Sequence, residues 1–330
     1  MNFLQSKYQI VETSPSNFQE KAMALFQYQY ERNAVYQTYA NLLHRTPDSI
    51  TNLHQIPFIP VSFFKTHRFL SEPFYDDMLY FESSTTTNQT PSKHYISDPG
   101  LYECSFMTAF EHFFGTASDY CIVGLLPSYL ERGHSSLVYM VEALIQQSKH
   151  PLSGFYLNNY NDLYQVLQQL ESQKQKTLVF GVTYALLDFA EKFPIPLTFT
   201  RIIETGGMKG RRIELTRTEV HNQLKTAFAL DQIYSEYGMT ELLSQAYSLQ
   251  NEVFEAPPWM RLFVRELNDP AAIASEGKGA INIIDLANRH SCAFLATDDY
   301  GEVFENGTFK IHGRIDHSEI RGCSLLTIND

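Results

Sequence analysis

The segment between about residues 98 and 250 alternates short apolar runs with helical patterns, and this alternation limits the fold more than any other feature. The apolar runs are "YCIVGLL", "LVFGVT", "FTRIIETGG" and "QIYSEYG". Helix starts lie between them: Asp98 with Pro99, a segment from about Gly133, and Thr216 with Glu219. Strands that alternate with helices at this spacing predict an α/β fold with a mainly parallel sheet and covering helices. Such sheets bind ligands at the carboxyl ends of their strands.

The flanking segments predict different structures. The N-terminal 1–75 is expected to be helical at first, with Asn17 and Glu20 at capping-box spacing. It then continues as an extended segment, "HQIPFIPVSFFKTHRF", that covers apolar surface. After residue 250 the helical patterns stop and strands separated by turns predict a C-terminal β-rich subdomain. We therefore expect one domain over 1–330, made of 1–75, an α/β body at 76–250 and the β-rich part at 251–330.

Charge and cysteine usage exclude several classes of protein. A formal net charge of −12 argues against binding nucleic acid, which needs clustered Lys and Arg. Four cysteines in 330 residues, without CxxC spacing, form neither a disulfide framework nor a zinc site. The chain has no apolar stretch of the roughly 18 residues that a membrane span requires, and its start does not resemble a signal peptide. We expect a cytoplasmic protein with reduced thiols.

A run of hydroxyl side chains follows the strand-like "LYFE". The loop offers Ser83, Ser84, Thr86 and Thr87, and Lys93 closes the segment. Hydroxyls and backbone N–H groups in a turn can hold phosphate oxygens, and a lysine can neutralise them. Taken alone, the segment is better explained as a solvated Ser/Thr loop.

Two further segments stand at predicted strand ends. In "IETGG", Thr205, Gly206 and Gly207 mark a sharp turn or a close approach to a ligand, although a plain turn explains them equally well. In "YGMTE", Tyr237, Thr240 and Glu241 surround Gly238. A carboxylate there could hold Mg²⁺ on a phosphate and a hydroxyl could position a substrate oxygen. The alternative is a helix start with Glu241 near the favourable end of the helix dipole.

The C-terminal part carries three more candidates. Asp299, in "ATDDYGEV", could grip a ribose diol with support from Arg314, although adjacent carboxylates before a glycine can simply mark a hairpin turn. Cys323 is either an apolar filler in a final strand or a nucleophile on a short arm. Arg321 and His317 could lower the pKa of its thiol, and Gly322 gives that arm freedom. The other three cysteines lie in apolar runs or a helix and are expected in the core.

The order of these motifs is more specific than any one of them. A Ser/Thr-rich loop, TGG, YGMTE, T-x-D-x-G and GR-x-D, in this order, resembles the adenylate-forming superfamily of acyl-CoA synthetases and their relatives. Within it the chain most resembles the LuxE-like acyl-protein synthetases, the fatty-acid-activating component of bacterial luminescence-type fatty acid reductases. "IPFIPVSFFK" is similar to their N-terminal region, and the final "GR…RGC" is similar to the segment whose cysteine carries the acyl group.

The resemblance implies that ATP and a carboxylic acid form an acyl-adenylate and pyrophosphate, with Mg²⁺ as cofactor. It implies a phosphate loop of Ser83, Ser84, Thr86, Thr87 and Lys93, and an adenine-proximal loop of Thr205, Gly206 and Gly207. Tyr237 and Gly238 would flank adenine, Thr240 would contact the α-phosphate or the carboxylate, and Glu241 would bind Mg²⁺. Asp299 would hold the ribose with Arg314 next to it, and Cys323 would accept the acyl group. His134 matches a histidine near the acyl pocket only loosely, and a capping or core role suits it better.

Two departures from the pattern define the alternatives. The phosphate loop has Thr85 and Asn88 where the family has glycines, and a β-branched Thr does not tolerate left-handed backbone. The smaller C-terminal domain with the catalytic lysine of acyl-CoA synthetases is expected to be absent, as in the acyl-protein synthetases. The acyl group would pass to a reductase or another acceptor protein. The alternatives are a ligase or acyltransferase that loads CoA or a carrier protein, and a non-catalytic subunit of an acyl-reductase complex.

Overall fold

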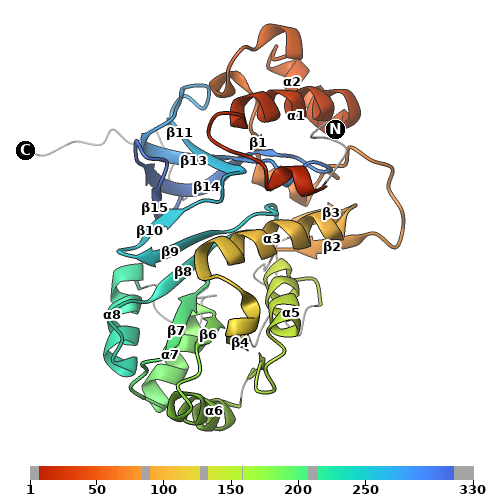
Figure 1. The fold of residues 1–330 in the computed structure, drawn as a ribbon. Helices are drawn as coiled ribbons and strands as arrows, with labels where there is room; N and C mark the ends of the chain where they lie inside the picture. Colours follow the sequence, from red (N-terminus) through yellow and green to blue (C-terminus); the bar gives the residue numbers. More distant parts are fainter. Residues whose placement is uncertain (1–6, 84–89, 127–132, 158, 207–214, 316–330) are drawn as a thin grey trace, which may run out of the picture.

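A computed structural model describes residues 7–83, 90–126, 133–157, 159–206 and 215–315. In this part of the chain a 13-stranded sheet runs in the order β12-β11-β13-β14-β15-β10-β9-β8-β7-β6-β4-β5, and β1 pairs with β14 beside this path. A separate two-stranded sheet consists of β2 (Leu79–Glu82) and β3 (Lys93–Ile96). Figure 1 shows helices at both ends of the molecule, with α1 and α2 at one and α6, α7 and α8 at the other.

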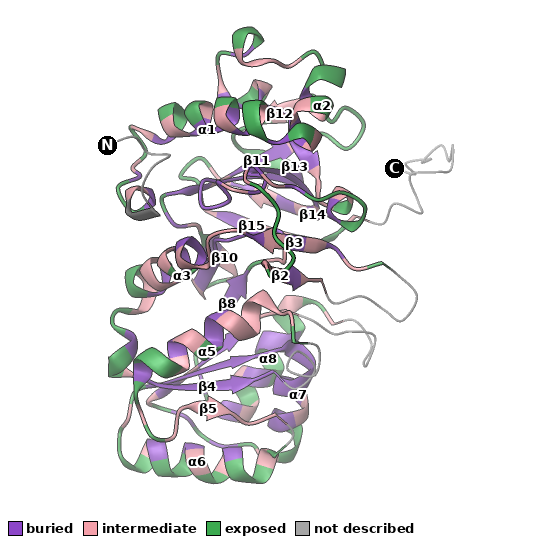
Figure 2. Ribbon diagram, turned by 90° about the vertical axis from the view of Figure 1, so that its right-hand side faces the viewer, coloured by how far each residue is buried: buried purple, intermediate pink, exposed green. Residues whose placement is uncertain are grey.

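The predicted parallel sheet is confirmed. Its strands all pair in parallel and are β5 (Gly154–Phe155), β4 (Cys121–Leu125), β6 (Thr177–Gly181), β7 (Thr200–Glu204) and β8 (Tyr234–Tyr237). The long helices that follow or separate them are α3 (Pro99–Phe114), α5 (Ser136–Ser148), α6 (Tyr160–Ser172), α7 (Thr183–Lys192) and α8 (Arg217–Phe228). Every residue of β4 and β6 is buried, as strands covered on both faces require. Figure 2 shows this buried layer between the helices.

Two of the predicted helix starts are made by the side chains that predicted them. Asp98 accepts a 3.2 Å hydrogen bond from the backbone N–H of Leu101, with Pro99 in the first turn of α3. Thr216 and Glu219 form a reciprocal capping box at the start of α8. Each such cap satisfies backbone N–H groups that have no partner inside the helix, which fixes where the helix begins.

An antiparallel half continues the same sheet beyond β8. Its strands are β9 (Ala246–Gln250), β10 (Val253–Glu255), β15 (Phe309–Arg314), β14 (Phe294–Val303), β13 (Gly277–Asp285), β11 (Met260–Arg265) and β12 (Ile273–Ala274). The predicted strands after residue 250 are confirmed, whereas β9 and β10 were not predicted. These two strands join the halves, since β9 pairs with β8 and β10 pairs with β15.

The N-terminal segment packs on the antiparallel half. Its helices are α1 (Phe18–Arg32) and α2 (Ala34–Leu42), and its short strand β1 (Ile59–Pro60) pairs in parallel with β14. The buried Gln29 fixes α1, because its side-chain amide donates to the carbonyls of Asn288 and Arg289 and its Oε1 accepts from the N–H of Ala293. The helical segment is thereby attached to the connection between β13 and β14, more than 250 positions away in the sequence.

Two details of the N-terminal prediction are wrong. Asn17 precedes α1, but its side chain accepts from the backbone of Ser14 instead of capping the helix. The apolar segment expected to be extended is extended only at β1 and then turns into a 3₁₀ helix, Val61–Lys65. At Asn17 a local turn with Ser14 uses the side-chain oxygen that would otherwise cap the helix.

Candidate active site

The hairpin β2–β3 meets the turn after β8 through two hydrogen bonds. His94, on β3, donates from Nδ1 to the backbone carbonyl of Thr240 over 2.8 Å. Ser92, at the start of the returning strand, hydrogen-bonds to the carboxylate of Glu241. The Ser83 hydroxyl accepts from the N–H of Ser92 over 2.8 Å, so the two ends of the hairpin loop are tied together at this point. The described ends of the segment predicted to hold phosphate, at Ser83 and Ser92, therefore lie beside the YGMTE segment.

His94 is fully buried, and its environment fixes its protonation state. Burial lowers the pKa of His94 to about 4, and the hydrogen bond to Thr240 opposes this only in part. The ring is therefore neutral at pH 7, with the proton on Nδ1 where the carbonyl accepts it. Its Nε2 has no hydrogen-bond partner among the described residues.

Glu241 is buried next to groups that stabilise its charge. Burial raises the pKa of its carboxyl, while the hydrogen bond from Ser92 and the positive charge of Arg314 oppose that rise. The backbone carbonyl of Glu241 accepts from the side chain of Asn288 over 2.7 Å. The Asp285 carboxylate holds the next residues, accepting from the N–H of Leu243 and the hydroxyl of Ser244. The turn is thus rigidly held.

Tyr237, Asp299 and Arg314 form a second connected group. The Tyr237 hydroxyl donates to Asp299 Oδ2 over 2.7 Å, and Asp299 Oδ1 lies 3.5 Å from Nε of Arg314. The tyrosine ring packs against Phe254 and Phe309. Burial and the neighbouring carboxylate raise the pKa of Tyr237 well above its usual value, so the hydroxyl stays protonated. The Arg314 side chain is 80% exposed, whereas that of Asp299 is only 10% exposed.

Thr205 and Gly206 follow β7, the strand beside β8. The N–H of Thr205 donates to the carbonyl of Gly181 at the end of β6, and the N–H of Gly206 donates to the Glu204 carboxylate. The same carboxylate accepts from the Thr183 hydroxyl. Gly206 has φ +76°, a left-handed conformation that favours glycine, so this site needs its glycine. The described part of TGG thus lies at the carboxyl edge of the parallel strands.

The structure brings together most of the predicted site residues that it describes. Ser83, Thr240 and Glu241 meet at the hairpin; Tyr237 and Gly238 lead into that turn; Asp299 and Arg314 face Tyr237. Lys93 differs from expectation, since its ammonium lies 3.0 Å from Glu82 across the hairpin and over the Tyr80 ring. The predicted residues outside the described ranges are Ser84, Thr86, Thr87, Gly207 and Cys323, together with Thr85, Asn88, His317, Arg321 and Gly322.

The structure excludes three alternative roles that the sequence left open for Glu241, Asp299 and His134. No helix starts at Thr240 and Glu241, which lie in a turn. Asp299 lies inside strand β14 opposite Arg314 and not in a hairpin turn. His134 does not cap a helix; its ring stacks on Tyr80 with centroids 4.1 Å apart, and its carbonyl accepts from the N–H of Glu82.

Sequence reasoning missed Ser92 and His94, although both lie beside Lys93, which closes the hydroxyl-rich loop. Their role comes from contacts with a turn almost 150 residues away, and nothing in the local pattern indicates that contact. A histidine between Lys93 and Tyr95 looks like an ordinary strand residue in the sequence.

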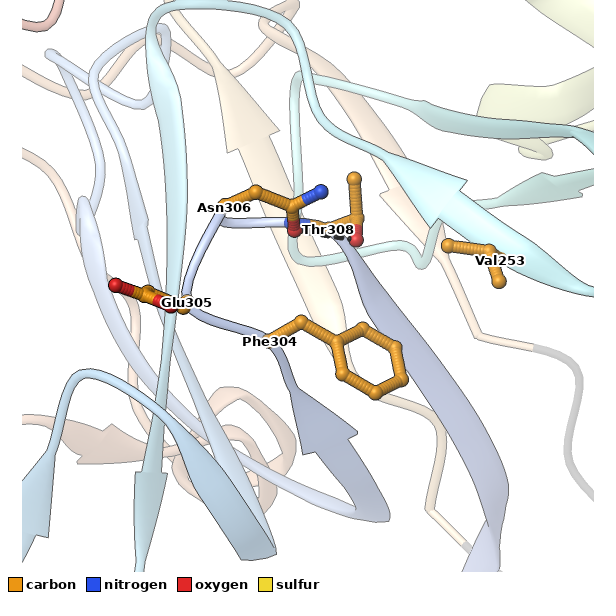
Figure 3. Close-up of a pocket in the computed structure, with 5 residues that line it drawn as sticks. All are labelled: Val253, Phe304, Glu305, Asn306 and Thr308. Atoms are coloured by element: carbon orange, nitrogen blue, oxygen red, sulfur yellow. Dashed lines mark hydrogen bonds between the residues drawn. The ribbon is translucent and has the colours of Figure 1, made fainter.

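Two surface hollows lie away from this site. One, of about 730 Å³, is lined by Val253 and by Phe304, Glu305, Asn306 and Thr308 of the β14–β15 turn (Figure 3), at the opposite end of β15 from Arg314. The other, of about 410 Å³, lies at the amino ends of β6, β7 and β8, near Lys176 and Arg201. Parallel sheets bind ligands at the carboxyl ends of their strands, so neither hollow competes with the site around Glu241.

Within 7–83, 90–126, 133–157, 159–206 and 215–315, no three or more His, Cys, Asp or Glu side chains gather as a metal centre would require. None of the helices in these ranges has the length and apolar character needed to cross a lipid bilayer.

The comparisons with known proteins concern the fold. No protein-family model and no curated relative matches the chain. The chain is similar to the ATP-bound MatB from Rhodopseudomonas palustris, with a TM-score of 0.55 and 14% identity over 73% of this chain and 49% of that one. It is also similar to the ATP-bound RpMatB-BxBclM chimera B3, with a TM-score of 0.54 and 14% identity over 74% of this chain and 49% of that one.

The chain therefore spans about half the length of these solved structures. At this level of identity the likeness shows the fold alone, an α/β fold with a mainly parallel sheet, covering helices and a C-terminal β-rich part, as the sequence predicted.

Proposed function

We propose that this protein activates a carboxylic acid with ATP as an acyl-adenylate and transfers the acyl group to its own Cys323. The observation that carries the proposal is the meeting of four segments far apart in sequence. Ser83, Tyr237, Glu241 and Asp299 gather around the carboxyl end of β8, because Ser83 bonds to Ser92, Ser92 to Glu241, and Tyr237 to Asp299. A parallel sheet binds ligands at this edge.

Asp299 suits the ribose of ATP. One carboxylate oxygen is held by Tyr237, and the other faces Arg314 in an ion pair that is largely open to solvent. Such exposed pairs contribute little stability, so an incoming diol can replace Arg314 at small cost. Two hydroxyl donors on a carboxylate make charge-assisted hydrogen bonds, which are stronger than neutral ones.

Glu241 suits Mg²⁺, with phosphate oxygens and water completing the shell. Mg²⁺ is commonly held by one or two protein carboxylates together with substrate phosphates, so the lack of a larger acidic cluster in the described residues fits this use. The raised pKa of the Glu241 carboxyl reflects its burial, which the charge of Arg314 offsets only in part. Bound there, the metal would stabilise charge on the phosphates. Ser83 and the N–H groups near Ser92 would face the same phosphates.

The reaction balances in two steps. In the first, a carboxylate oxygen of the acid attacks the α-phosphorus, the bond from that phosphorus to the bridging oxygen breaks, and pyrophosphate leaves. In the second, the Cys323 thiolate attacks the acyl carbon, AMP leaves with the bonding electron pair, and a thioester forms. The thiol proton passes to solvent or to a neighbouring base before this attack.

Chain length allows Cys323 to reach this site. Cys323 lies nine positions after Arg314, and nine extended residues span up to about 30 Å. Cys121 and Cys292 are fully buried, and burial raises the pKa of their thiols to about 11 and about 12. Neither thiol is suited to accept an acyl group. We further propose a fatty acid as substrate, a reductase or other acyl acceptor as partner, and a cytoplasmic location that keeps the thiol reduced.

Acid-dependent ATP–pyrophosphate exchange tests the first step, and mass spectrometry tests the second. After incubation with ATP, Mg²⁺ and acid, we expect a hydroxylamine-sensitive acyl adduct on Cys323. Cys323→Ser should keep the exchange and lose the adduct. A Cys323→Ser protein that still produces acyl-CoA would instead support a CoA or carrier ligase. A folded protein without exchange for any acid would support a non-catalytic subunit.

A further inference from the structure

Glu236 is a buried carboxyl next to the site that the proposed mechanism does not use. It precedes Tyr237 on β8, so its side chain points to the opposite face of the sheet from the tyrosine. It is 9% exposed. A Cβ at Gly238 would lie 2.5 Å from Glu236 Oε1, which shows that the carboxyl lies over the glycine, toward the carboxyl end of the strand. A side chain at this position would force the Glu236 carboxyl to move.

No residue in the described part of the chain donates a hydrogen bond to this carboxyl. The nearest hydroxyls are directed elsewhere: that of Tyr102, on α3, donates to the Ser136 carbonyl over 2.9 Å, and that of Tyr247 contacts Met140 Sδ. Burial, with a smaller contribution from the charge of Glu204, raises the pKa of Glu236 to about 8. At pH 7 its carboxyl is therefore mainly protonated, with an O–H that has no acceptor among the described residues.

Gln245 supplies the complementary group. It is 4% exposed and lies opposite Gly238, since its Cγ is 3.5 Å from the position of a Cβ there. Its side chain interacts with Tyr102, while its Oε1 has no partner among the described residues. The Glu236 carboxyl and the Gln245 side chain, whose buried Oε1 is unmatched among the described residues, thus flank one glycine. Buried polar groups in proteins are nearly always hydrogen-bonded, so such a pair calls for a ligand that completes it.

We propose that Glu236 and Gln245 recognise a hydroxyl group on the acyl part of the substrate, which makes the preferred substrate a hydroxy-substituted carboxylic acid. This inference rests on the proposed function. A hydroxyl both donates and accepts, so it can donate to Gln245 Oε1 and accept from the Glu236 O–H at once. An ammonium group only donates and would require an ionised Glu236. A plain hydrocarbon chain would leave both groups buried and unpaired, and sites built to bond a hydroxyl reject analogues that lack it.

The test is acid-dependent exchange with matched acids: hexadecanoate, its hydroxylated counterparts and an amino-substituted counterpart, with benzoate and hydroxybenzoates as a second series. The wild-type protein should favour one hydroxy acid over its unsubstituted partner by at least about 100-fold in kcat/KM. Glu236→Leu should reduce that preference to about tenfold or less. Glu236→Gln, whose amide still donates, should keep most of it. Glu255→Leu, an exposed glutamate on β10, is the control and should change nothing.

The outcomes separate the two proposals. Equal rates for hydroxylated and plain acids would overturn the hydroxyl assignment and leave acid activation intact. A preference for the amino-substituted acid that is lost in Glu236→Gln would also overturn the hydroxyl assignment. If no acid supports exchange, the proposed function fails. The hydroxyl assignment is then tested by the effect of a hydroxy acid on the Tm of the wild-type protein and of Glu236→Leu. A hydroxy acid that raises the Tm of the wild-type protein but not of Glu236→Leu supports it, and no rise in either protein overturns it. Glu236→Leu should itself fold, because it replaces an unpaired buried carboxyl with an apolar side chain.

Discussion

The Tyr237 hydroxyl donates a 2.7 Å hydrogen bond to Asp299, and this bond joins the last parallel strand of the sheet to its antiparallel half. Both residues are buried, so the orientation of the Asp299 carboxylate is fixed before any ligand arrives. Preorganised groups of this kind are what binding and catalysis require, because no ordering cost remains to be met when the ligand binds.

Asp299→Asn should weaken ATP binding without unfolding the protein. The change removes the charge from hydrogen bonds to the ribose, a loss of about 1.5–3 kcal/mol that corresponds to about a 10- to 150-fold higher KM for ATP in the exchange assay. Glu302→Gln is the matched control, because Glu302 lies on the same strand in surface ion pairs that contribute little. An unchanged KM in Asp299→Asn would exclude Asp299 from the nucleotide site.

Glu241→Gln should abolish most of the Mg²⁺-dependent exchange. A glutamine can still accept the hydrogen bond from Ser92, so the turn should keep its conformation while the metal loses its carboxylate. We expect a fall of at least about 100-fold in kcat, the size seen when a key electrostatic group is removed. Ser92→Ala should reduce kcat much less, since it only orients Glu241. Equal exchange in Glu241→Gln and wild type, at limiting Mg²⁺, would contradict the assignment.

The sequence predicted the parallel half of the fold better than the arrangement of the site. Alternating patterns identify β4, β6, β7 and β8, because buried parallel strands are continuous apolar runs. The pattern does not reveal β9 and β10, which are short and gain their positions by pairing with β8 and β15. The same holds for side chains. The order of the motifs predicted that Tyr237 and Asp299 lie in one site. It did not predict that Lys93 pairs with Glu82, because the register of the β2–β3 hairpin places these two residues opposite each other.

Thiol labelling should distinguish the buried cysteines from a reactive one. Cys121 and Cys292 are fully buried, and burial raises the pKa of their thiols to about 11 and about 12, so little thiolate forms at pH 7.5. Iodoacetamide should leave both unmodified in the native protein and modify them in urea. Peptide mass spectrometry after labelling measures this directly. Modification of Cys292 in the native state, as fast as in urea, would show that this part of the core opens readily.

His94 should make the protein less stable as the pH falls toward 4. The pKa of His94 is about 4 in the folded protein, below the usual 6.5. Between pH 4 and pH 6.5 the histidine is therefore protonated in the unfolded chain and neutral in the folded one. The contribution of His94 to the free energy of unfolding is complete above about pH 6.5. Below that pH it decreases by at most about 1.4 kcal/mol per pH unit. His94→Asn can keep a donor for the Thr240 carbonyl but does not titrate. Denaturant unfolding at pH 5 and pH 7 should therefore show a smaller pH effect in this variant, and an equal effect would assign the titration to other groups.

Glu236 should produce the opposite dependence at higher pH. Its pKa is raised to about 8 in the folded protein, so between about pH 4.5 and pH 8 the unfolded chain has lost a proton that the folded chain keeps. Stability from this group is therefore highest below pH 4.5 and decreases as the pH rises, again by at most about 1.4 kcal/mol per unit, until it levels off above pH 8. Glu236→Gln removes the titration while keeping the shape of the side chain. The free energy of unfolding of this variant should exceed that of the wild type by a margin that grows from pH 5 to pH 8. A margin that stays constant over this range would mean that Glu236 is ionised in the folded protein, with a cation or donor beside it.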